Sequence, residues 1–425
     1  MEKYKSYKDS GIEWLGEIPE HWEIKRIKDV IKVSQGLQIS RSERFHKPRE
    51  NTVQYNTIPS IQGKIEEYIY KPSKNVLCTK EEMLVVRTGS GVGKILTNIE
   101  GAFHNNFFKA KNNKTIASKF CYFLLISYNT QFLMRSYAGL TAIPDLNHSD
   151  FYSIFFTLPK SKEQTQIANY LDIKTTTIDK KITLLEQKIK HYKAYRKTLI
   201  NKIVTKGLDK RVKLKDSGIS WIGEVPEHWE VKRIKDIFSI SRGRAIGKTE
   251  LKDTGVYPVY SSQTKNKGIL GYINTYDFNT NLLTWTTDGV NAGTVFIREG
   301  KFNCTNICGT LTPKKNNKLS LDYMGVAVQQ STQHNKRIDT NGAKIMSNEM
   351  AVIDIVFPPY EQQQQIANYL DTKTTTIDKI INNIETQITM LKELRKTLIN
   401  EVVTGKVKVT STSLSHQKAS NQPIV

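Results

Sequence analysis

Two blocks of this sequence each occur twice, and that duplication restricts the chain to a repeated architecture. The first block reads DSGIEWLGEIPEHWE from Asp9 and DSGISWIGEVPEHWE from Asp216. The second block opens with QIANYLD at Gln166 and again at Gln365, and each copy closes with RKTLIN. The copies lie about 200 residues apart, whereas solenoid repeats have periods of about 20–50 residues. The duplication therefore involves whole domains, and a chain of 425 residues is long enough for two of them.

The segments enclosed by the repeated blocks, residues 33–156 and 239–356, have almost no continuous sequence in common. Both contain short β-branched and aromatic runs separated by turn residues, a pattern typical of strands. The sequence EGAF at Glu100 matches EGKF at Glu299, which indicates one shared fold, and Glu299–Lys301 predicts a hairpin turn. A duplicated frame with two different inserts predicts one protein that reads two different targets. The expected strands are Val76–Leu77, Met83–Val86, Ile95–Leu96 and Phe107–Phe108 in the first insert, and Leu282–Trp285 and Thr294–Ile297 in the second.

The residues that follow the first insert predict a strand and then a helix. Phe151–Leu158 is rich in aromatic and β-branched residues, and it predicts a strand that ends before Pro159. Ser161 followed by Gln164 forms a capping-box pattern, which is typical of a helix start. A helix is therefore expected to begin at about Ser161.

Three consecutive threonines, Thr175–Thr177, interrupt this helical pattern. Threonine is a poor helix former, and the threonines followed by Asp179 resemble a second helix start. The pattern therefore predicts a short helix to about Asp172, a cap or kink, and a long helix from about Ile178 to Val204. Gly207 supplies the residue that commonly ends a helix.

The long helix carries a narrow apolar seam in both copies, stepping by three and four positions. So narrow a seam favours a coiled-coil partner, and the other copy packed antiparallel is the expected one because each helix starts from its own insert. Burial of both helices in one ordinary core is the alternative. About 27 residues give a rod of roughly 40 Å, close to the length of about 34–36 Å for one turn of B-DNA. The expected seam residues are Ile178, Ile182, Leu185, Ile189, Tyr192, Leu199 and Ile203, and Ile377, Ile381, Ile384, Ile388, Leu391, Leu398 and Val402.

The charge of the chain favours a polyanionic partner. It contains 63 Lys and Arg against 41 Asp and Glu, a formal net charge of +22. Nucleic acid is the most common partner of so basic a protein, and a generally basic protein without such a partner is the alternative. No run of about 20 apolar residues is present and the N-terminus does not resemble a secretory signal, so we expect a cytoplasmic protein without a membrane span.

The four cysteines, Cys78, Cys121, Cys304 and Cys308, are too few for a disulfide framework in so long a chain. The spacing of Cys304 and Cys308 lacks a second pair of metal ligands, and the first insert has no counterpart. We therefore expect reduced, partly buried thiols and no metal site.

With this organisation, the chain resembles the specificity (S) subunit of type I restriction–modification systems. The resemblance is carried by the KDSGIEWLGEIPEHWE-type frame before each insert and by the helical block from EQxQIANYLDxKTTTID to RKTLIN after each. Both blocks occur twice in the order typical of that family. The resemblance covers nearly everything except the polar tail.

The resemblance implies an α+β fold, in which two α/β target recognition domains are separated by two long antiparallel helices. These helices form a coiled-coil spacer within a cyclic pseudo-two-fold duplication. Each insert would read one half of an asymmetric bipartite site in double-stranded DNA, and the helices would act as a ruler between the halves. The expected boundaries are 1–160 for the first frame and recognition domain, 161–207 for the first spacer helix, 208–358 and 359–405 for the second set, and 406–425 for a disordered tail.

The resemblance also implies protein partners. A specificity subunit docks two methyltransferase (M) subunits and, in the full complex, two restriction (R) subunits. It has no catalytic activity and no cofactor of its own. The M subunits would use S-adenosylmethionine, and the R subunits ATP and Mg²⁺.

Three motifs resemble catalytic sites but lack residues that the chemistry requires. The run from Phe357 to Tyr360 resembles the Asn/Asp-Pro-Pro-Tyr motif of amino-methyltransferases, but phenylalanine cannot hydrogen-bond the target amine. Residues 87–95 resemble a phosphate loop that lacks its first glycine and its hydroxyl residue. Asp288 with Glu299 and Lys301 resembles a nuclease site, but the first insert has no counterpart. We therefore expect no catalytic and no metal-binding residue.

Both inserts contain clusters of residues suited to DNA contact. Arg and Lys bind guanine, Asn and Gln bind adenine, and short polar groups bind phosphates. A solvated surface residue or a phosphate contact is the alternative for each single candidate. The candidates are Gln38, Ser40, Arg41, Ser42, Arg44, Arg87, Asn105 and Asn106 in the first insert, and Arg242, Arg244, Lys248, Tyr260, Ser261, Ser262, Gln263, Lys265, Asn266, Thr286 and Thr287 in the second.

Two other functions stay open at this point. A stand-alone DNA-binding or architectural protein would not need docking surfaces for other subunits, and co-purification with a larger methyltransferase chain would count against it. A nuclease or methylase in its own right would use the incomplete motifs. Magnesium-dependent cleavage by the isolated chain would favour that alternative.

Overall fold

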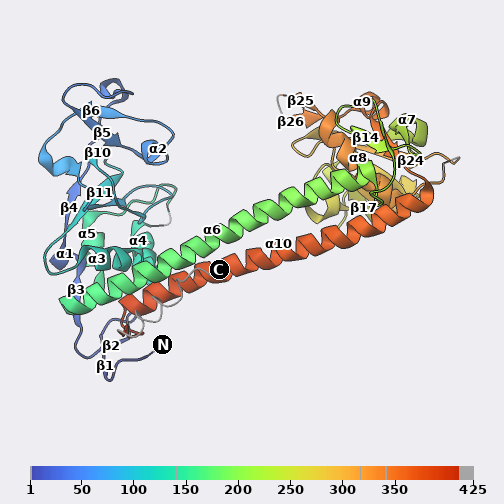
Figure 1. The fold of residues 1–425 in the computed structure, drawn as a ribbon. Helices are drawn as coiled ribbons and strands as arrows, with labels where there is room; N and C mark the ends of the chain where they lie inside the picture. The colour runs from blue at the N-terminus through green and yellow to red at the C-terminus, as the bar shows by residue number, and fades with distance from the viewer. Residues whose placement is uncertain (1, 140, 316, 340–341, 411–425) are drawn as a thin grey trace. The chain divides into compact units, whose positions relative to one another are not determined.

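The computed structural model describes residues 2–139, 141–315, 317–339 and 342–410. The chain forms two compact units. The first unit combines residues 1–186 with 386–425, and the second comprises residues 187–385. Each unit therefore contains one frame, one insert, and one part of each long helix, α6 (Ser161–Lys206) and α10 (Tyr360–Val403) (Figure 1).

Each insert contains two four-stranded sheets, and the strand order is the same in both units. One pair in each insert is parallel, and its other pairs are antiparallel. The two inserts therefore share one fold although their sequences differ. In spatial order the strands of the first unit are β4 (Ile31–Gln35), β11 (Phe107–Asn112), β8 (Met83–Val86) and β9 (Ile95–Leu96), then β6 (Tyr68–Tyr70), β5 (Thr52–Asn56), β10 (Gly101–Phe103) and β7 (Leu77–Cys78). Their counterparts are β16 (Phe238–Arg242), β24 (Cys308–Pro313), β20 (Leu282–Thr286) and β22 (Val295–Arg298), then β18 (Ile269–Ile273), β17 (Tyr257–Tyr260), β23 (Lys301–Cys304) and β19 (Phe278–Asn279).

The central strands β8 and β20 are buried along their whole length, as continuous apolar runs predict. In the second unit Trp285 fills the space above β24, and a Cβ at Gly309 would overlap its ring. Only glycine fits opposite this tryptophan. Trp285 also donates a hydrogen bond from Nε1 to the carbonyl of Ile345, 2.9 Å away, which satisfies its buried N–H.

Each frame forms a hairpin, and the strand that follows pairs with the last strand of its insert. The hairpins are β1 (Tyr7–Asp9) with β2 (Glu17–Pro19) and β13 (Leu214–Asp216) with β14 (Glu224–Pro226). The closing pairs are β3 (Glu23–Arg26) with β12 (Phe155–Leu158) and β15 (Glu230–Arg233) with β27 (Asp354–Phe357). The second unit adds a sheet of β21 (Asp288–Gly289), β26 (Gly342–Lys344) and β25 (Arg337–Asp339).

Short helices complete both units. In the first unit α3 (Ser118–Ile126) and α4 (Tyr128–Ala138) lie beside the start of α6 and the end of α10 (Figure 1). Gln164 of α6 accepts a hydrogen bond from the Ala117 N–H at 2.7 Å, and Asn400 of α10 accepts one from Asn129 at 3.2 Å. The helices are α1 (Ile27–Val30), α2 (Ile58–Ile61), α3 (Ser118–Ile126), α4 (Tyr128–Ala138) and α5 (His148–Ser153), then α7 (Ile234–Ile237), α8 (Leu321–Asn335) and α9 (Ser347–Ala351).

A buried tryptophan fastens each frame to the first turn of a long helix. Trp22 donates from Nε1 to Glu163 at 3.1 Å, and Trp229 donates from Nε1 to Gln362 at 2.6 Å. Each frame also contacts the end of the other long helix. Lys406 beyond α10 donates to the carbonyl of Leu15, and the end of α6 at Gly207 lies against Trp229. The expected cyclic duplication is therefore confirmed.

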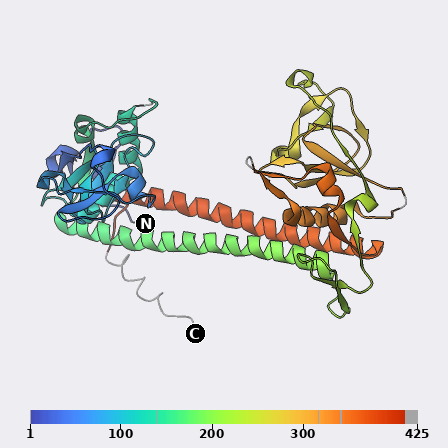
Figure 2. The same ribbon diagram turned by 90° about the horizontal axis from the view of Figure 1, so that it is seen from above.

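The two long helices pair antiparallel. In the first unit Asp179 of α6 lies 3.0 Å from Arg395 of α10, and in the second unit Arg196 of α6 lies 3.1 Å from Asp378 of α10. The two aspartates are equivalent positions of the repeat, and so are the two arginines. Figure 2 shows the start of α6 in green and the end of α10 in red side by side at the first unit. Of the expected seam residues, Leu185, Ile189, Tyr192 and Leu391 are half-buried and all the others are buried.

The expected break near the three threonines is wrong, because α6 runs without interruption from Ser161 to Lys206. The Thr175 hydroxyl donates to the carbonyl of Leu171 at 2.7 Å, and Thr177 donates to Ile173 at 2.8 Å. Each hydroxyl is thereby satisfied within the helix, and tertiary packing outweighs the low helix propensity of threonine. With 46 residues, the helix is about 70 Å long and exceeds the expected rod of roughly 40 Å.

Three smaller expectations also need correction. Residues 151–153 are helical, because Asn147 caps α5 by accepting from the Asp150 N–H at 2.8 Å. Gln164 does not close a capping box; its amide bonds the carbonyls of Pro159 and Thr115. A turn does occur at Gly300, but the strands on either side of it, β22 and β23, belong to different sheets and form no hairpin.

The expectation of disorder from residue 406 onward is wrong for residues 406–410. Lys406 donates from Nζ to the carbonyls of Leu15 and Glu17, and the Lys408 N–H donates to the Glu2 carbonyl at 2.9 Å. Residues 406–410 therefore pack against the first frame. Residues 411–425 lie outside the described part of the chain.

Candidate nucleic-acid interface

A short 3-10 turn after the first strand of each insert presents a cationic side chain to solvent. The turns are η1 (Arg41–Glu43) and η3 (Lys248–Glu250). Glu43 and Glu250 close them by accepting the backbone N–H groups of Ser40 and Gly247. Arg41 and Lys248 therefore occupy equivalent places, are exposed, and have no side-chain partner within the described ranges.

The first turn is held in shape by its own polar residues. The Ser40 hydroxyl lies 2.8 Å from Ser42 Oγ and donates to Glu43 at 2.8 Å. Next to it, the Asn105 amide donates to Gln38 Oε1 at 3.1 Å, so these two predicted residues form one amide pair. Both amides keep further donors and acceptors for a ligand. An exposed amide pair of this kind suits contact with an adenine edge.

A hollow of about 500 Å³ adjoins this pair in the first unit. Arg41, His46, His104 and Asn106 are among its lining residues. Burial and the charge of Arg44 lower the pKa of His104, so its ring is neutral at pH 7. Its Nδ1 accepts the N–H of Asn106 at 3.1 Å. The structure therefore brings the predicted Gln38, Arg41, Asn105 and Asn106 to one side of the insert, although two of them lie more than 60 positions along the chain from the others.

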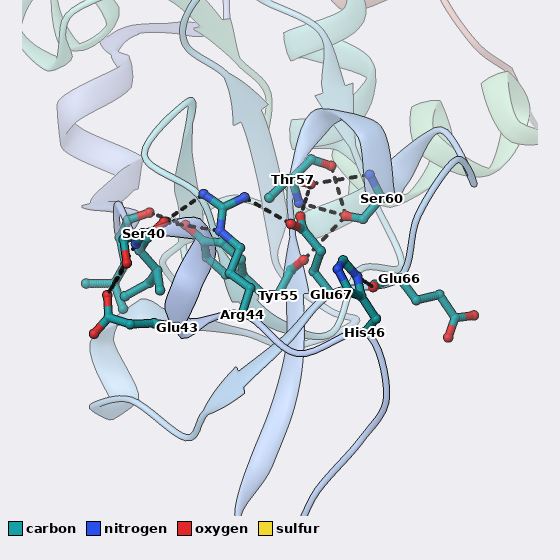
Figure 3. A network of polar contacts seen from close by, with 11 residues as sticks. Ser40, Glu43, Arg44, His46, Tyr55, Thr57, Ser60, Glu66 and Glu67 are labelled. Atoms are coloured by element: carbon teal, nitrogen blue, oxygen red, sulfur yellow. Dashed lines mark hydrogen bonds and ion pairs between the residues drawn. The ribbon is translucent and has the colours of Figure 1, made fainter.

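Arg44 is half-buried, and its guanidinium points to Glu67 (Figure 3). Its guanidinium donates to Glu67 at 3.0 Å and twice to the carbonyl of Ile39, at 3.1 and 2.7 Å. It also lies over the ring of Tyr55 at 5.2 Å. With its donors engaged by the protein, Arg44 shapes the 39–44 loop, and the geometry argues against the prediction that it contacts bases.

Glu67 is the anchor of this network (Figure 3). It is 4% exposed and accepts hydrogen bonds from the Thr57 hydroxyl at 2.7 Å and from Arg44. Burial alone would raise the pKa of Glu67, but the hydrogen bonds from Thr57 and Arg44 and the arginine charge outweigh burial and lower it. The carboxylate is therefore ionised at neutral pH.

We expect Glu67→Gln to lower the free energy of opening the first insert by about 1–3 kcal/mol at pH 7, because the half-buried Arg44 loses its charged acceptor. Since the folded pKa is lowered, the contribution of Glu67 is complete above its ordinary pKa of about 4.5 and is lost as the pH falls through the folded value. Hydrogen exchange of peptides covering residues 39–67 measures the effect, and it should shrink from pH 7 to pH 3.5. Glu66→Gln, one residue away and exposed, is the matched control. Equal protection in both variants at pH 7 would contradict the assignment.

Within each insert, an ion pair holds a second loop in place. Arg87 contacts Asp145 at 2.8 Å in the first unit, and Asp288 lies 3.7 Å from Lys344 in the second. The hydrogen bond from Arg87 lowers the pKa of Asp145. Arg87 also donates its backbone N–H to the carbonyl of Asn106 at 2.7 Å, which places it beside the amide cluster. Arg87 remains half-exposed, but one face of its guanidinium is committed to Asp145.

The second insert uses its predicted arginines in a similar way. Arg244 donates to Glu250 at 2.7 Å and to Asp277 at 3.1 Å, so it braces the η3 turn and is no free base reader. Arg242 is exposed and approaches the sulfur of Met346 at 3.4 Å. Of these three cations, Lys248 alone has no side-chain partner among the described residues.

Residues 261–268 form a second polar loop among the candidates of the second insert, and positions 264–267 of it are exposed. Lys265 and Asn266 are exposed and have no side-chain partner in the described chain. Gln263 is half-buried and its amide donates to the carbonyl of Ile269, while the Ser262 carbonyl accepts from Asn291 at 3.3 Å. Tyr260 is half-buried under a guanidinium. The tip of the loop is thus free and its base is fixed.

Three predicted contacts are contradicted by burial. Ser261 is 9% exposed, and Thr286 and Thr287 are 2% and 1% exposed. Thr286 lies in the fully buried strand β20, and the Thr287 hydroxyl donates to the carbonyl of Ile307 at 3.1 Å. Side chains buried to this extent cannot reach DNA from this fold.

The structure also adds residues that the sequence pattern missed. Asn306 is exposed at the turn after β23, where the first insert has Asn105 after β10. Lys267 is exposed in the 261–268 loop. The helical blocks lie 199 positions apart and the two asparagines 201, so comparing the inserts with a shift of two positions would have aligned Asn306 with Asn105. Lys267 carries no such signal.

The described residues offer no catalytic constellation. No group of three His, Cys, Asp or Glu side chains in that part of the chain is arranged to hold a metal ion. The cysteines are free and buried; burial raises the pKa of Cys78 and Cys121 to about 12 and that of Cys308 to about 11, and it raises the pKa of Cys304 further. Pro358 and Pro359 lie between β27 and α10, where they separate a strand from a helix. No described helix is long and apolar enough to cross a membrane.

Comparison with known proteins gives the same two-part division. The family described as "Type I restriction modification DNA specificity domain" matches residues 19–191 and again residues 226–390. A putative type I specificity subunit of Mycoplasma pneumoniae is 37% identical over 169 residues, which are 40% of this chain and 54% of the relative. A second from the same organism is 32% identical over 252 residues, 59% of this chain and 87% of the relative. The chain thus spans about half the length of the first relative and most of the second.

Solved structures support the fold. A chain from a study of complex assembly and conformational transition in a type I R-M system has a TM-score of 0.72 at 14% identity, covering 92% of this chain and 99% of that one. The HsdS subunit from Thermoanaerobacter tengcongensis has a TM-score of 0.54 at 14% identity, covering 92% and 98%. The family match extends over both units, each with its frame, insert and helix. The chain therefore belongs to the family of type I restriction–modification DNA specificity proteins.

Proposed function

We propose that this chain is the DNA-recognition subunit of a type I restriction–modification complex, and that each insert reads one half of an asymmetric bipartite site. The observation that carries the proposal is the pair of inserts with one strand order and different exposed side chains. The first presents Arg41 beside the Gln38–Asn105 amide pair, and the second presents Lys248 and the Lys265–Asn266 tip. Identical readers on a two-fold frame would select a palindrome, whereas different readers select two unrelated half-sites.

The subunit itself performs no chemistry in this proposal. Two M subunits supply S-adenosylmethionine and methylate the site, and two R subunits with ATP and Mg²⁺ join the full assembly. The family membership supports this division of labour. The complex would act in the cytoplasm, where the chromosome is accessible.

The proposal is tested by co-expressing the full chain with an M subunit of a type I system and mapping methylated bases in the genomic DNA. We expect a single two-part motif with unlike halves that disappears when this chain is omitted. Methylation without the chain, or cleavage by the isolated chain with Mg²⁺, would overturn the proposal. Failure to co-purify with any M subunit while still binding DNA would favour a stand-alone DNA-binding protein.

We expect the binding of the assembled complex to its mapped site to depend strongly on salt. Each neutralised phosphate contributes about −0.9 to the slope of log K against log[salt]. Removing the exposed cations with Arg41→Gln or Lys248→Gln should make the slope shallower by about one phosphate each. Fluorescence anisotropy with a labelled duplex between about 50 and 200 mM salt measures the slope.

Lys119→Gln is the matched control for these substitutions, because Lys119 on α3 is paired with Asp172 at 2.7 Å. Its slope should equal that of the unmodified complex. A slope shallower than about −2 for the unmodified complex would count against DNA binding as the main source of affinity.

A further inference from the structure

The second insert contains a buried arginine that has no equivalent in the first insert. Arg298, the last residue of β22, is 4% exposed. No carboxylate pairs with it among the described residues. Its guanidinium is instead stabilised by uncharged groups. It lies 3.6 Å from the centre of the Tyr260 ring and 4.4 Å from that of Phe296, and it donates hydrogen bonds to uncharged acceptors. Burying a guanidinium without a carboxylate is unfavourable, so an interior arginine of this kind calls for an explanation beyond packing.

The donors of Arg298 point to the 261–268 loop. Nη1 donates to the carbonyl of Lys267 at 2.7 Å, and Nε donates to the Thr284 hydroxyl of β20 at 3.0 Å. Nη2 is buried without a hydrogen-bond partner, and a Cβ at Gly268 would lie 2.9 Å from it. One end of the guanidinium is therefore fixed to the central sheet and the other end touches the loop backbone.

The loop is held in a conformation that its sequence does not favour. Asn266, Lys267 and Gly268 have φ values of 48°, 50° and 85°, three successive residues in the left-handed region. Glycine and asparagine adopt this region readily, but lysine does not. The carbonyl that receives the Arg298 hydrogen bond belongs to this lysine. Removing that hydrogen bond would let the tip relax.

In the first insert a different buried charged residue holds the equivalent loop in place. The segment after β5, residues 57–67, occupies the place of the segment after β17, residues 261–268. There Glu67 holds Thr57 and Arg44. Each insert thus fixes an exposed polar segment through one buried charged side chain, taken from a different strand or loop in each unit.

We propose that Arg298 is a positioning residue that holds the 261–268 loop in the conformation that reads one half of the DNA target. The inference rests on the proposed function. Arg298 is buried and does not touch DNA. Its effect reaches the target through Lys265, Asn266 and Lys267, the exposed tip of the loop.

The test uses the full chain with its Arg298 changed to Met or to Lys, co-expressed with an M subunit, and genomic methylation is mapped. We expect discrimination to fall by about tenfold at positions of one half-site, with the other half-site unchanged. Lysine should not restore it, because one ammonium cannot bridge Thr284 and the Lys267 carbonyl as the guanidinium does. Asn266→Ala should weaken the same half-site, and Gln38→Ala the opposite one.

Arg211→Met is the matched control, since the Arg211 side chain is 90% exposed and, among the described residues, bonds only Asp209. Hydrogen exchange of β20 and β24 shows whether the insert stays folded in each variant. Should Arg298→Met unfold it, Thr284→Val removes the acceptor of the Arg298 Nε without changing the loop, and it should weaken the same half-site. Unchanged discrimination in a folded Arg298→Met variant, or in a folded Thr284→Val variant, would overturn the proposal. Absence of any two-part motif with the unmodified chain would instead refute the proposed function.

Discussion

Exchanging residues 31–153 for the corresponding insert of another family member should replace one half of the methylated motif and leave the other half intact. The exchange ends before β12, because Phe155–Leu158 pairs with β3 of the frame and the Thr157 hydroxyl donates to the Val403 carbonyl at 2.7 Å. Each mismatched base pair costs about 1–3 kcal/mol, so the original half-site should lose recognition completely. Methylation mapping before and after the exchange measures the change.

The reciprocal exchange of residues 238–352 is the control, and it should change the opposite half only. In the exchange of residues 31–153, the donor insert must keep a backbone N–H at the position of Asn129, because this N–H donates to Asn400 of α10. A chimaera that altered both halves, or neither, would show that the inserts do not read DNA independently.

Lengthening both long helices together should lengthen the spacer between the half-sites. The antiparallel pairing of Asp179 with Arg395 and of Arg196 with Asp378 places Tyr192 opposite Asn382. Four residues inserted after Tyr192, and four more after Ile381, extend each helix by about 6 Å and preserve both ion pairs. At about 3.4 Å per base pair, the spacer should grow by one to two base pairs. The half-site sequences should not change, because no base-reading residue is touched.

The insertion after Tyr192 alone is the informative comparison. It shifts one side of the seam by a full turn against the other helix, and the coiled coil must absorb a stutter. We expect this variant to be less stable than the double insertion, as judged by thermal unfolding of the complex. An active double insertion with an unaltered spacer would mean that the helices do not set the distance.

The repeated blocks and the helical seam could be predicted from the sequence because both are local or periodic patterns. The spacing of Ile377, Ile381, Ile384 and Ile388 predicts their shared face directly, and all four are buried. The helix break was wrongly predicted for the same reason. Local propensity at Thr175–Thr177 favours an interruption, and only the packed helix shows that the hydroxyls are satisfied by carbonyls one turn earlier.

The strand pairing was largely beyond the sequence. β8 and β9 match the expected ranges because buried apolar runs are visible. The short, mixed strands β5 and β17 were missed, since their pairing with β10 and β23 is parallel and joins residues far apart in the chain. No periodic signal marks such strands, and their side chains acquire a buried face only once the partner strand is present.

The sequence by itself determined that the chain repeats a frame around two different inserts, and that charged and amide residues cluster within them. Only the tertiary structure decided which of those residues are available to a ligand. Arg41 and Arg44 are three positions apart and chemically identical, yet Arg41 faces solvent and Arg44 is bound to Glu67. The sequence predicts that Thr286 contacts DNA, but its side chain lies in the core. Availability depends on partners that are distant in sequence, such as Glu67 for Arg44 and Arg298 for the 261–268 loop, and those contacts exist only in the folded chain.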